Sequence, residues 1–255
     1  MMIGAITQYI DVAQIVLYVF WAFFAGLIYY LHQEGKREGY PLHYDGNPNL
    51  DVQGFPAIPS PKTFLLRDGS TRTVPNGNTG EVPDLKATSY GGYPGAPITP
   101  TGNPMLDGVG PGAYAIRPDV PDMTVDQQPK IVPLRVATNF HLESSDPNPI
   151  GMNVTAGDGN VAGQITDVWV DRAEILIRYL EVKVASNGRT VLIPHNFARI
   201  TSKGVKVKSI FAEHFADVPG TKNPESVTLM EEERIMAYYG AGTLYASPER
   251  TEPLL

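Results

Sequence analysis

Hydrophobic residues are distributed unevenly along this chain, and the first long run of them predicts a membrane-spanning helix. Residues 12–31 (VAQIVLYVFWAFFAGLIYYL) contain no charged side chain and one strongly polar one, Gln14. Twenty residues of α-helix extend about 30 Å, which matches the hydrocarbon thickness of a bilayer. A buried helix of a soluble protein is rarely apolar on every face over such a length. We therefore expect a single transmembrane helix.

The flanks of this run argue against a cleaved secretory signal and predict an orientation. A signal peptide has a basic n-region and a small-residue cleavage site, whereas the first ten residues carry no Lys or Arg. Tyr29 and Tyr30 stand where an interfacial aromatic belt is expected. Lys36 and Arg37 follow the span and only Asp11 precedes it, so the positive-inside rule places the C-terminal part in the cytoplasm. We expect these two tyrosines and two cations at the lipid interface.

Two small residues within the span, Ala22 and Gly26, are four positions apart and therefore share one helix face. Such a pair allows a second helix to approach closely. Transmembrane helices are rich in small residues, so the spacing also has a chance explanation. Helix packing at Ala22 and Gly26 is one of two open interpretations.

Beyond the span, residues 40–135 hold sixteen of the 23 prolines and twelve of the 25 glycines. Long helices and central strands do not tolerate this density. Disorder is the alternative, but the segment also contains scattered large apolar residues, which disordered linkers generally lack. We expect an ordered, irregular layer that lies against a partner surface, with a short hairpin formed by residues 63–66 and 71–74.

After residue 131 the pattern changes to alternating apolar and polar positions, which is typical of strands. The predicted strands are residues 165–170, 179–184, 190–193 and 205–210. Tight turns between them favour a small antiparallel barrel. Residues 225–239 predict a helix whose solvated face carries Glu231 to Glu233 and which breaks at Gly240 and Gly242.

The predicted fold is thus a single N-terminal transmembrane α-helix plus a mainly-β cytoplasmic domain with a C-terminal helix. We expect three regions: residues 1–36 with the periplasmic N-terminus and the span, residues 37–135 as an extended surface segment, and residues 136–255 as the globular domain.

Composition removes several classes of function. The chain has no cysteine, so disulfides, thiolate metal sites and Cys nucleophiles are excluded. Its net charge of -7 argues against nucleic-acid binding, which needs a concentrated basic surface. No phosphate-binding loop, dinucleotide fingerprint or zinc-protease helix is present. The five histidines are at least eleven residues apart, so we predict no local metal site and no catalytic residue.

Several short motifs, in this order and spacing, carry a resemblance to a known family. They are residues 24–30 (FAGLIYY), 37–42 (REGYPL), 100–105 (PTGNPM), 107–111 (DGVGP), 167–171 (DVWVD) and 244–250 (LYASPER). Together they resemble the H subunit of the purple-bacterial photosynthetic reaction centre over essentially the full chain. The strand-rich part is similar to that family's PRC-barrel domain.

The resemblance implies a non-pigment, non-catalytic subunit that caps the cytoplasmic face of the pigment-binding L and M subunits. Such a subunit stabilises the quinone region and conducts protons to the secondary quinone during light-driven cyclic electron transfer. Bacteriochlorophyll, bacteriopheophytin, quinones, non-haem iron and a carotenoid are expected in the partner subunits, and none is expected on this chain alone. Further expected partners are membrane lipids, a cytochrome subunit and light-harvesting 1 antenna polypeptides. The expected location is the bacterial inner (intracytoplasmic, or chromatophore) membrane, crossed once.

The candidate proton-transfer residues form a cluster in the sequence: Asp167, Asp171, Glu174 and Arg178. Spacing along a strand and a turn places them near one another. Burial and like-charge neighbours raise carboxyl pKa values toward neutrality. In the family, the acid that matches Glu174 belongs to the proton path, and those that match Asp171 and Arg178 lie in its network. The competing interpretation is an ordinary solvated acidic turn with a salt bridge.

One departure from the family concerns the surface where protons are taken up. Some members carry a His-x-His pair there, whereas this chain has residues 126–128 (DQQ). Asp126 remains a candidate proton acceptor, but the metal-binding property does not carry over.

Two rival functions remain at this stage. The first is a membrane-tethered PRC-barrel adaptor or assembly factor that binds its partners transiently. The second is a membrane-anchored hydrolase, which has little support because no nucleophile, base and orienting acid can be nominated together.

Overall fold

The computed structural model describes residues 6–7, 10–44, 47–77, 85–91, 93 and 95–251, and for residues 43, 44 and 47–51 the backbone alone. The chain forms two compact units. The first comprises Met1–Asp84 with Tyr90–Pro97, and the second Leu85–Ser89 with Ile98–Leu255. Residues 98–135, which the sequence analysis grouped with the extended segment, thus belong to the same unit as the globular domain.

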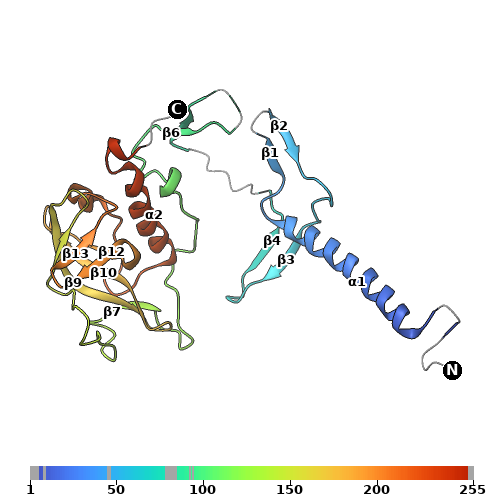
Figure 1. The fold of residues 1–255 in the computed structure, drawn as a ribbon, viewed down its shortest axis with the longest axis horizontal. Helices are drawn as coiled ribbons and strands as arrows, with labels where there is room; N and C mark the ends of the chain where they lie inside the picture. Colours follow the sequence, from blue (N-terminus) through green and yellow to red (C-terminus); the bar gives the residue numbers. More distant parts are fainter. Residues whose placement is uncertain are drawn as a thin grey trace. The chain divides into compact units, whose positions relative to one another are not determined.

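The first unit begins with one long helix, α1 (Val12–Glu34), shown in blue in Figure 1. Asp11 caps it by accepting a hydrogen bond from the Gln14 N–H at 2.7 Å. By length and composition, α1 is the one helix among the described residues that qualifies to span a membrane. No residue of α1 is buried within the chain. Ala22 and Gly26 are exposed on it, so their packing against a second helix stays a prediction.

The segment after α1 folds back onto the helix end. Lys36, in a 3₁₀ turn (η1, Gly35–Arg37), is 4% exposed and donates hydrogen bonds to the carbonyls of Gln53 at 2.5 Å and Pro56 at 2.7 Å. Arg37 donates to Glu34 at 2.7 and 2.8 Å. Their expected place at a lipid interface stays a prediction, and within the chain both side chains have polar partners. Two charged side chains therefore hold the loop to the helix.

Two hairpins complete the first unit, and the second of them matches the prediction. They are β1 (Leu42–Tyr44) with β2 (Asn47–Val52), and β3 (Lys62–Leu65) with β4 (Thr71–Val74). The connection of the second hairpin contains Gly69 at φ +81°, a conformation that favours glycine.

The second unit is built around a seven-stranded sheet of the half-barrel type. The strand order is β11-β10-β9-β8-β13-β12. β7 lies off this path and pairs with the C-terminal end of β9, whereas β8 pairs with the N-terminal end of β9. The bounds are β7 Ile131–Pro133, β8 Asn153–Thr155, β9 Val161–Asp171, β10 Leu176–Val184, β11 Thr190–Pro194, β12 Ala198–Thr201 and β13 Gly204–Val207. Pairing is antiparallel except between β13 and β8, which are parallel. The predicted mainly-β architecture is confirmed, with this one exception to the expected antiparallel order.

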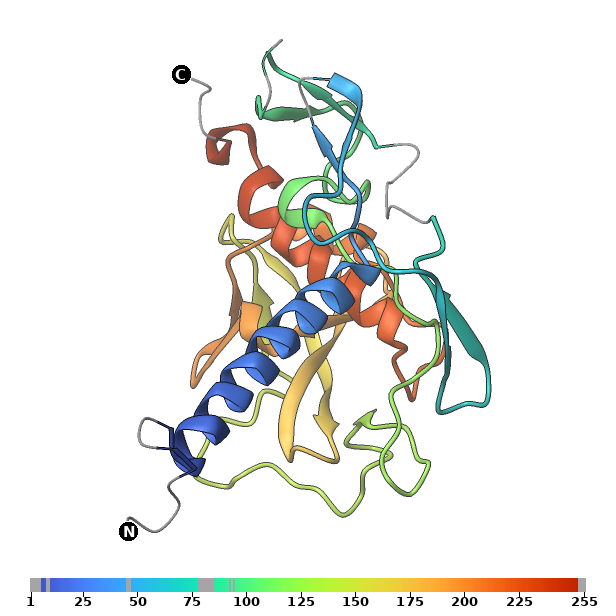
Figure 2. The ribbon, with the colours of Figure 1, turned by 90° about the vertical axis from the view of Figure 1, so that its right-hand side faces the viewer.

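The second unit also contains shorter elements and one helix. They are the hairpin of β5 (Ala87–Ser89) and β6 (Ile98–Pro100), the 3₁₀ turns η2 (Gly110–Gly112), η3 (His195–Phe197), η4 (Ala212–Asp217) and η5 (Pro248–Arg250), and the helix α2 (Leu229–Tyr245). Figure 1 and Figure 2 both show α2, in red, alongside the sheet.

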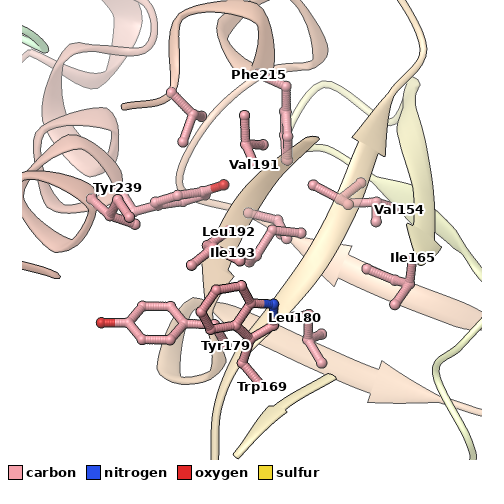
Figure 3. Packing of buried hydrophobic residues seen from close by; sticks show 14 of the residues in the cluster. Val154, Ile165, Trp169, Tyr179, Leu180, Val191, Leu192, Ile193, Phe215 and Tyr239 are labelled. Carbon is pink, nitrogen blue, oxygen red and sulfur yellow. The ribbon is translucent and has the colours of Figure 1, made fainter. Parts of the chain in front are cut away.

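The core of the second unit lies between the sheet and α2 (Figure 3). Trp169 on β9 and Tyr179 on β10 are paired in register, and both are at most 2% exposed. Tyr239 of α2 stacks near Phe197 with ring centroids 5.8 Å apart and meets Phe215 edge-on. Full burial of one large apolar side chain stabilises a fold by about 1.5–3 kcal/mol, so this cluster is the main source of stability for the unit.

A buried ion network fastens the chain after β7 to the sheet. The Arg135 Nη1 lies 2.9 Å from both Asp167 Oδ2 and Glu181 Oε2. Trp169 and Thr166 donate further hydrogen bonds to the Glu181 carboxylate at 3.0 and 2.8 Å. Burial of two carboxylates is costly unless a cation and donors satisfy them, and here both are present.

The start of α2 differs from the prediction because its cap lies later in the sequence. Thr228 Oγ1 accepts the Glu231 N–H at 3.1 Å, and the Glu231 carboxylate accepts the Thr228 N–H at 2.9 Å. This capping box begins the helix at Leu229 rather than at residue 225. Glu231 is only 6% exposed, so the expectation that it belongs to a solvated face was wrong.

The end of α2 also differs, because Gly240 and Gly242 lie inside the helix instead of ending it. A Cβ on Gly240 would lie 2.9 Å from the carbonyl oxygen of Pro111. A Cβ on Gly242 would lie 2.6 Å from the carbonyl oxygen of Ser209. These glycines allow the helix to approach neighbouring backbone closely. From the sequence alone, the same glycines predict a helix break.

We predict that Gly242→Ala lowers the stability of the second unit by about 1–3 kcal/mol, the usual cost of overpacking. The added methyl meets backbone, which cannot move aside as a flexible side chain can. Thermal unfolding of the full chain in detergent measures the effect. Gly35→Ala is the control, because nothing lies within 4 Å of its Cβ position. Equal midpoints for Gly242→Ala and wild type would contradict the close-approach explanation.

Candidate functional site

A cleft of about 540 Å³ in the second unit gathers the charged residues of interest. It lies where the end of β9, the start of β10, the β7 edge and the first turns of α2 meet. Its lining consists of Arg117, Asp122, Lys130, Ile131, Asp171, Leu176, Ile177, Arg178, Tyr179, His195, Asn196, Leu229, Glu232, Glu233 and Met236. Nine of these fifteen are Asp, Glu, Lys, Arg, His or Tyr, so the cleft is suited to ions and protons rather than to an apolar ligand.

Asp171 ends β9 and is 0% exposed. Its Oδ1 accepts the backbone N–H groups of Ala173 at 2.9 Å and Glu174 at 3.0 Å, which fixes the turn into β10. Its other oxygen, Oδ2, is buried without a hydrogen-bond partner. Such a group is costly unless a charge or water compensates it.

The compensating charge is Lys130, whose Nζ lies among three carboxylates. It is 3.1 Å from Glu174 Oε1, 3.4 Å from Asp171 Oδ2 and 3.8 Å from Asp122 Oδ2. The hydrogen bond to Glu174, together with the nearby negative charges, raises the pKa of Lys130 above its usual value despite partial burial. Lys130 therefore stays protonated at neutral pH and holds the three acids together.

A second cluster of polar groups in the cleft is centred on Glu232 of α2. Glu232 Oε2 accepts a hydrogen bond from the Tyr179 hydroxyl at 2.8 Å and is 4.0 Å from Arg178 Nη2. Burial raises the pKa of Glu232 above its usual value, and the contacts with Tyr179 and Arg178 only partly oppose this. Glu232 therefore holds a proton more strongly than an ordinary glutamate does.

The turn that carries Glu174 is strained. Ile175 has φ +56°, a left-handed conformation that is a genuine outlier for a β-branched residue. Its side chain is 77% exposed, so burial within this chain does not explain the strain. Strained residues of this kind cluster at functional sites.

The structure brings together only part of the predicted cluster. Asp171 and Arg178 line the cleft, and Glu174 contacts its Lys130. Arg178 pairs with Glu232 instead of Asp171 or Glu174. Asp167 is bound in the Arg135 network and does not line the cleft, and its proton-transfer role stays a prediction. Asp126 is exposed in the turn between Thr124 and Gln128 and is not among the lining residues either.

Near the C-terminal end of α1, Tyr29 and Tyr30 are 47% and 50% exposed. Their side chains are free to meet a lipid interface, and this assignment stays a prediction. Tyr29 also lies beside Phe55, with ring centroids 5.9 Å apart.

Sequence reasoning missed Lys130, Asp122 and Glu232. Lys130 directly precedes β7, and the pairing of Ile131 with Asp171 is what brings it to the acids. That register is a long-range property that sequence spacing does not contain. For Glu232 a weak signal existed, because it lies one helical turn from Leu229 and Met236 is one turn further on, both lining the same cleft.

We predict that Lys130→Met destabilises the second unit by about 1–3 kcal/mol at neutral pH, because it leaves the buried Asp171 oxygen without a charge partner. The loss should shrink in acid, where protonated carboxyls no longer need a cation. Unfolding midpoints of the full chain across pH measure this. Lys183→Met, an exposed lysine on β10, is the control. A pH-independent loss would contradict the electrostatic role.

We further predict the sign of a pH effect at Glu232. A carboxyl whose folded-state pKa is raised destabilises the fold above that pKa, and the penalty disappears as pH falls through it. Glu232→Gln removes the charge but keeps an acceptor for the Tyr179 hydroxyl. The stability of the variant relative to wild type should therefore rise as pH increases from acid to neutral. A fall over that range would show that the carboxylate is net stabilising.

Comparison with known families gives two matches that together cover most of the chain. A family model for the photosynthetic reaction centre, H-chain N-terminal region, matches residues 4–136. A model for the PRC-barrel domain matches residues 142–214. The first match contains α1 and the cleft residues up to Ile131, and the second contains the strands β8 to β13.

Proposed function

Because the chain belongs to the photosynthetic reaction centre H-chain family, we propose that it caps the cytoplasmic face of the L and M subunits and conducts protons to the secondary quinone. The family is a structural subunit of a membrane complex, and α1 is the element that associates this chain with the membrane. The proposed orientation has a periplasmic N-terminus and a cytoplasmic second unit, which follows from Lys36 and Arg37 after the span.

The observation that supports a proton-transfer role is that the carboxylates around the Lys130 ammonium differ in their exposure to solvent. The Glu174 and Asp122 side chains are 53% and 49% exposed, whereas Asp171 on the same Lys130 is fully buried. An exposed carboxylate exchanges protons directly with water. Burial raises the pKa of Glu232, so this acid holds a proton more strongly than an ordinary glutamate does. The cleft thus offers successive acceptors from solvent inward.

Exposed apolar side chains beside these acids support a capping role. Ile116 is 87% exposed, Val125 95% and Ile175 77%, and each neighbours a polar segment of the site in sequence. A partner surface placed over this side of the unit would bury these three side chains. A partner that covers them also limits the access of bulk water, which leaves the carboxylates as the route for protons.

The pigments, quinones, non-haem iron and carotenoid of such a complex belong to the partner subunits in this proposal. They supply light capture and electron transfer, and this chain contributes acids, positioning and coverage. A cytochrome subunit, antenna polypeptides and lipids are proposed as further neighbours.

We predict that Glu174→Gln slows the proton-coupled transfer of the second electron to the secondary quinone by roughly tenfold or more, within the range that positioned proton-transfer groups contribute. The slowing should increase with pH as protons become scarce. Flash-induced absorption kinetics of the purified complex measure it. Glu213→Gln is the control, because Glu213 is an acid with a 78% exposed side chain that does not line the cleft.

The same preparation separates a subunit from a transient adaptor. When the full chain is captured through a C-terminal tag after detergent extraction, a subunit retains near-infrared-absorbing pigment protein in a fixed one-to-one ratio. Unchanged second-electron kinetics in Glu174→Gln would contradict proton conduction. Substoichiometric pigment would instead support the adaptor function.

A further inference from the structure

A second cleft, of about 490 Å³, lies at the β12–β13 hairpin, and its charges are of one sign. It is lined by Asn196, Phe197, Ala198, Arg199, Lys206, Lys208, Ser209, Thr243 and Arg250. None of these lining residues is acidic. In a protein with a net charge of -7, a cleft whose charged residues are all basic is unexpected.

Three of the cations stand on one face of the hairpin without an ion-pair partner. Arg199 of β12 is directly opposite Lys206 of β13 in the antiparallel register, and Lys208 follows two residues later on the same side. Among the described residues, no carboxylate lies within ion-pair distance of these three side chains. Like charges placed directly opposite each other destabilise a strand pair. An anion bound between them would turn this repulsion into attraction.

Ser209 gives a second, independent sign of a ligand. It lines the cleft, is 6% exposed, and its hydroxyl is buried without a hydrogen-bond partner. A buried hydroxyl without a partner costs free energy comparable to a lost hydrogen bond. An unpaired hydroxyl is a donor that a ligand oxygen can satisfy.

Arg250 adds a rigid positive charge. Its guanidinium donates to the carbonyls of Ser209 at 2.6 Å, Gly242 at 2.7 Å and Lys208 at 2.9 Å. It also lies over the ring of Phe211, 4.8 Å from the centroid. Neutral groups hold it, and no carboxylate among the described residues forms an ion pair with it, so its charge contributes to the potential of the cleft.

We propose that this cleft binds a phosphate group, either free or as the headgroup of an anionic lipid. Phosphate carries up to two negative charges and several acceptor oxygens. It therefore matches Arg199, Lys206 and Lys208 as charges and Ser209 as a donor. Guanidinium groups bind phosphate oxygens in pairs, which assigns Arg199 the orienting role. The lining of this cleft shares only Asn196 with that of the acidic cleft, and the proposal does not depend on proton conduction.

The test compares two variants that each remove two positive charges. Arg199→Gln with Lys206→Gln removes the opposed pair, and Lys183→Gln with Lys203→Gln is the control on exposed positions outside the cleft. Calorimetric titration of the detergent-purified full chain with inorganic phosphate, against chloride at equal ionic strength, measures the free ligand. Flotation with phosphatidic acid vesicles, against phosphatidylcholine vesicles, measures the headgroup.

We expect the Arg199 and Lys206 variant to weaken binding at least tenfold, with little change in the control. Binding of inorganic phosphate supports a free phosphate ligand. Binding to phosphatidic acid vesicles alone supports a lipid headgroup. The proposal is overturned if wild type binds neither probe, or if both charge variants lose the same affinity, since the latter indicates only net charge.

Ser209→Ala distinguishes a ligand donor from a structural residue. Removal of a buried hydroxyl that has no partner should leave the unfolding midpoint unchanged or raise it. Phosphate affinity should nevertheless fall several-fold. If affinity remains at the wild-type value, Ser209 does not contact the ligand, and the site loses its buried donor.

Discussion

One lysine ammonium among three carboxylates determines the geometry of the acidic cleft. Lys130 lies within 3.1–3.8 Å of Glu174, Asp171 and Asp122, and Asp171 is fully buried. Without that cation the buried Asp171 oxygen has no charge partner. The turn that Asp171 stabilises, which positions Glu174, would then be weakened. The pairing of β7 with β9 is therefore the contact that builds this cluster, because it places Lys130 at the end of the longest strand.

The two units of the chain share a dependence on surfaces that the chain does not supply. In the first unit, α1 buries none of its residues, and only a membrane or another protein can cover twenty-three residues of this composition. In the second unit, Val125 and Ile175 are among the most exposed apolar side chains and neighbour polar residues of the cleft. A subunit of a larger membrane complex fits both features, whereas a freely diffusing enzyme fits neither.

The sequence predicted those features whose signals are local. An apolar run predicts α1 regardless of tertiary structure, and the alternation of apolar and polar residues along 179–184 predicts β10. The prediction failed where distant backbone decides the outcome. Gly240 and Gly242 are close approaches to Pro111 and Ser209, which no local pattern reveals. Asp167 and Asp171 lie in one strand but pair with different cations. Arg135, which follows β7, binds Asp167, and Lys130, which precedes β7, binds Asp171.

The central claim is that acids of the cleft change protonation when the secondary quinone is reduced. Flash-induced infrared difference spectra of the complex, recorded in the carboxylic acid region for wild type and Glu232→Gln, test it most directly. The account predicts a protonation band that is lost or reduced in the variant, because burial gives Glu232 a raised pKa. Identical difference spectra for the two proteins would contradict it.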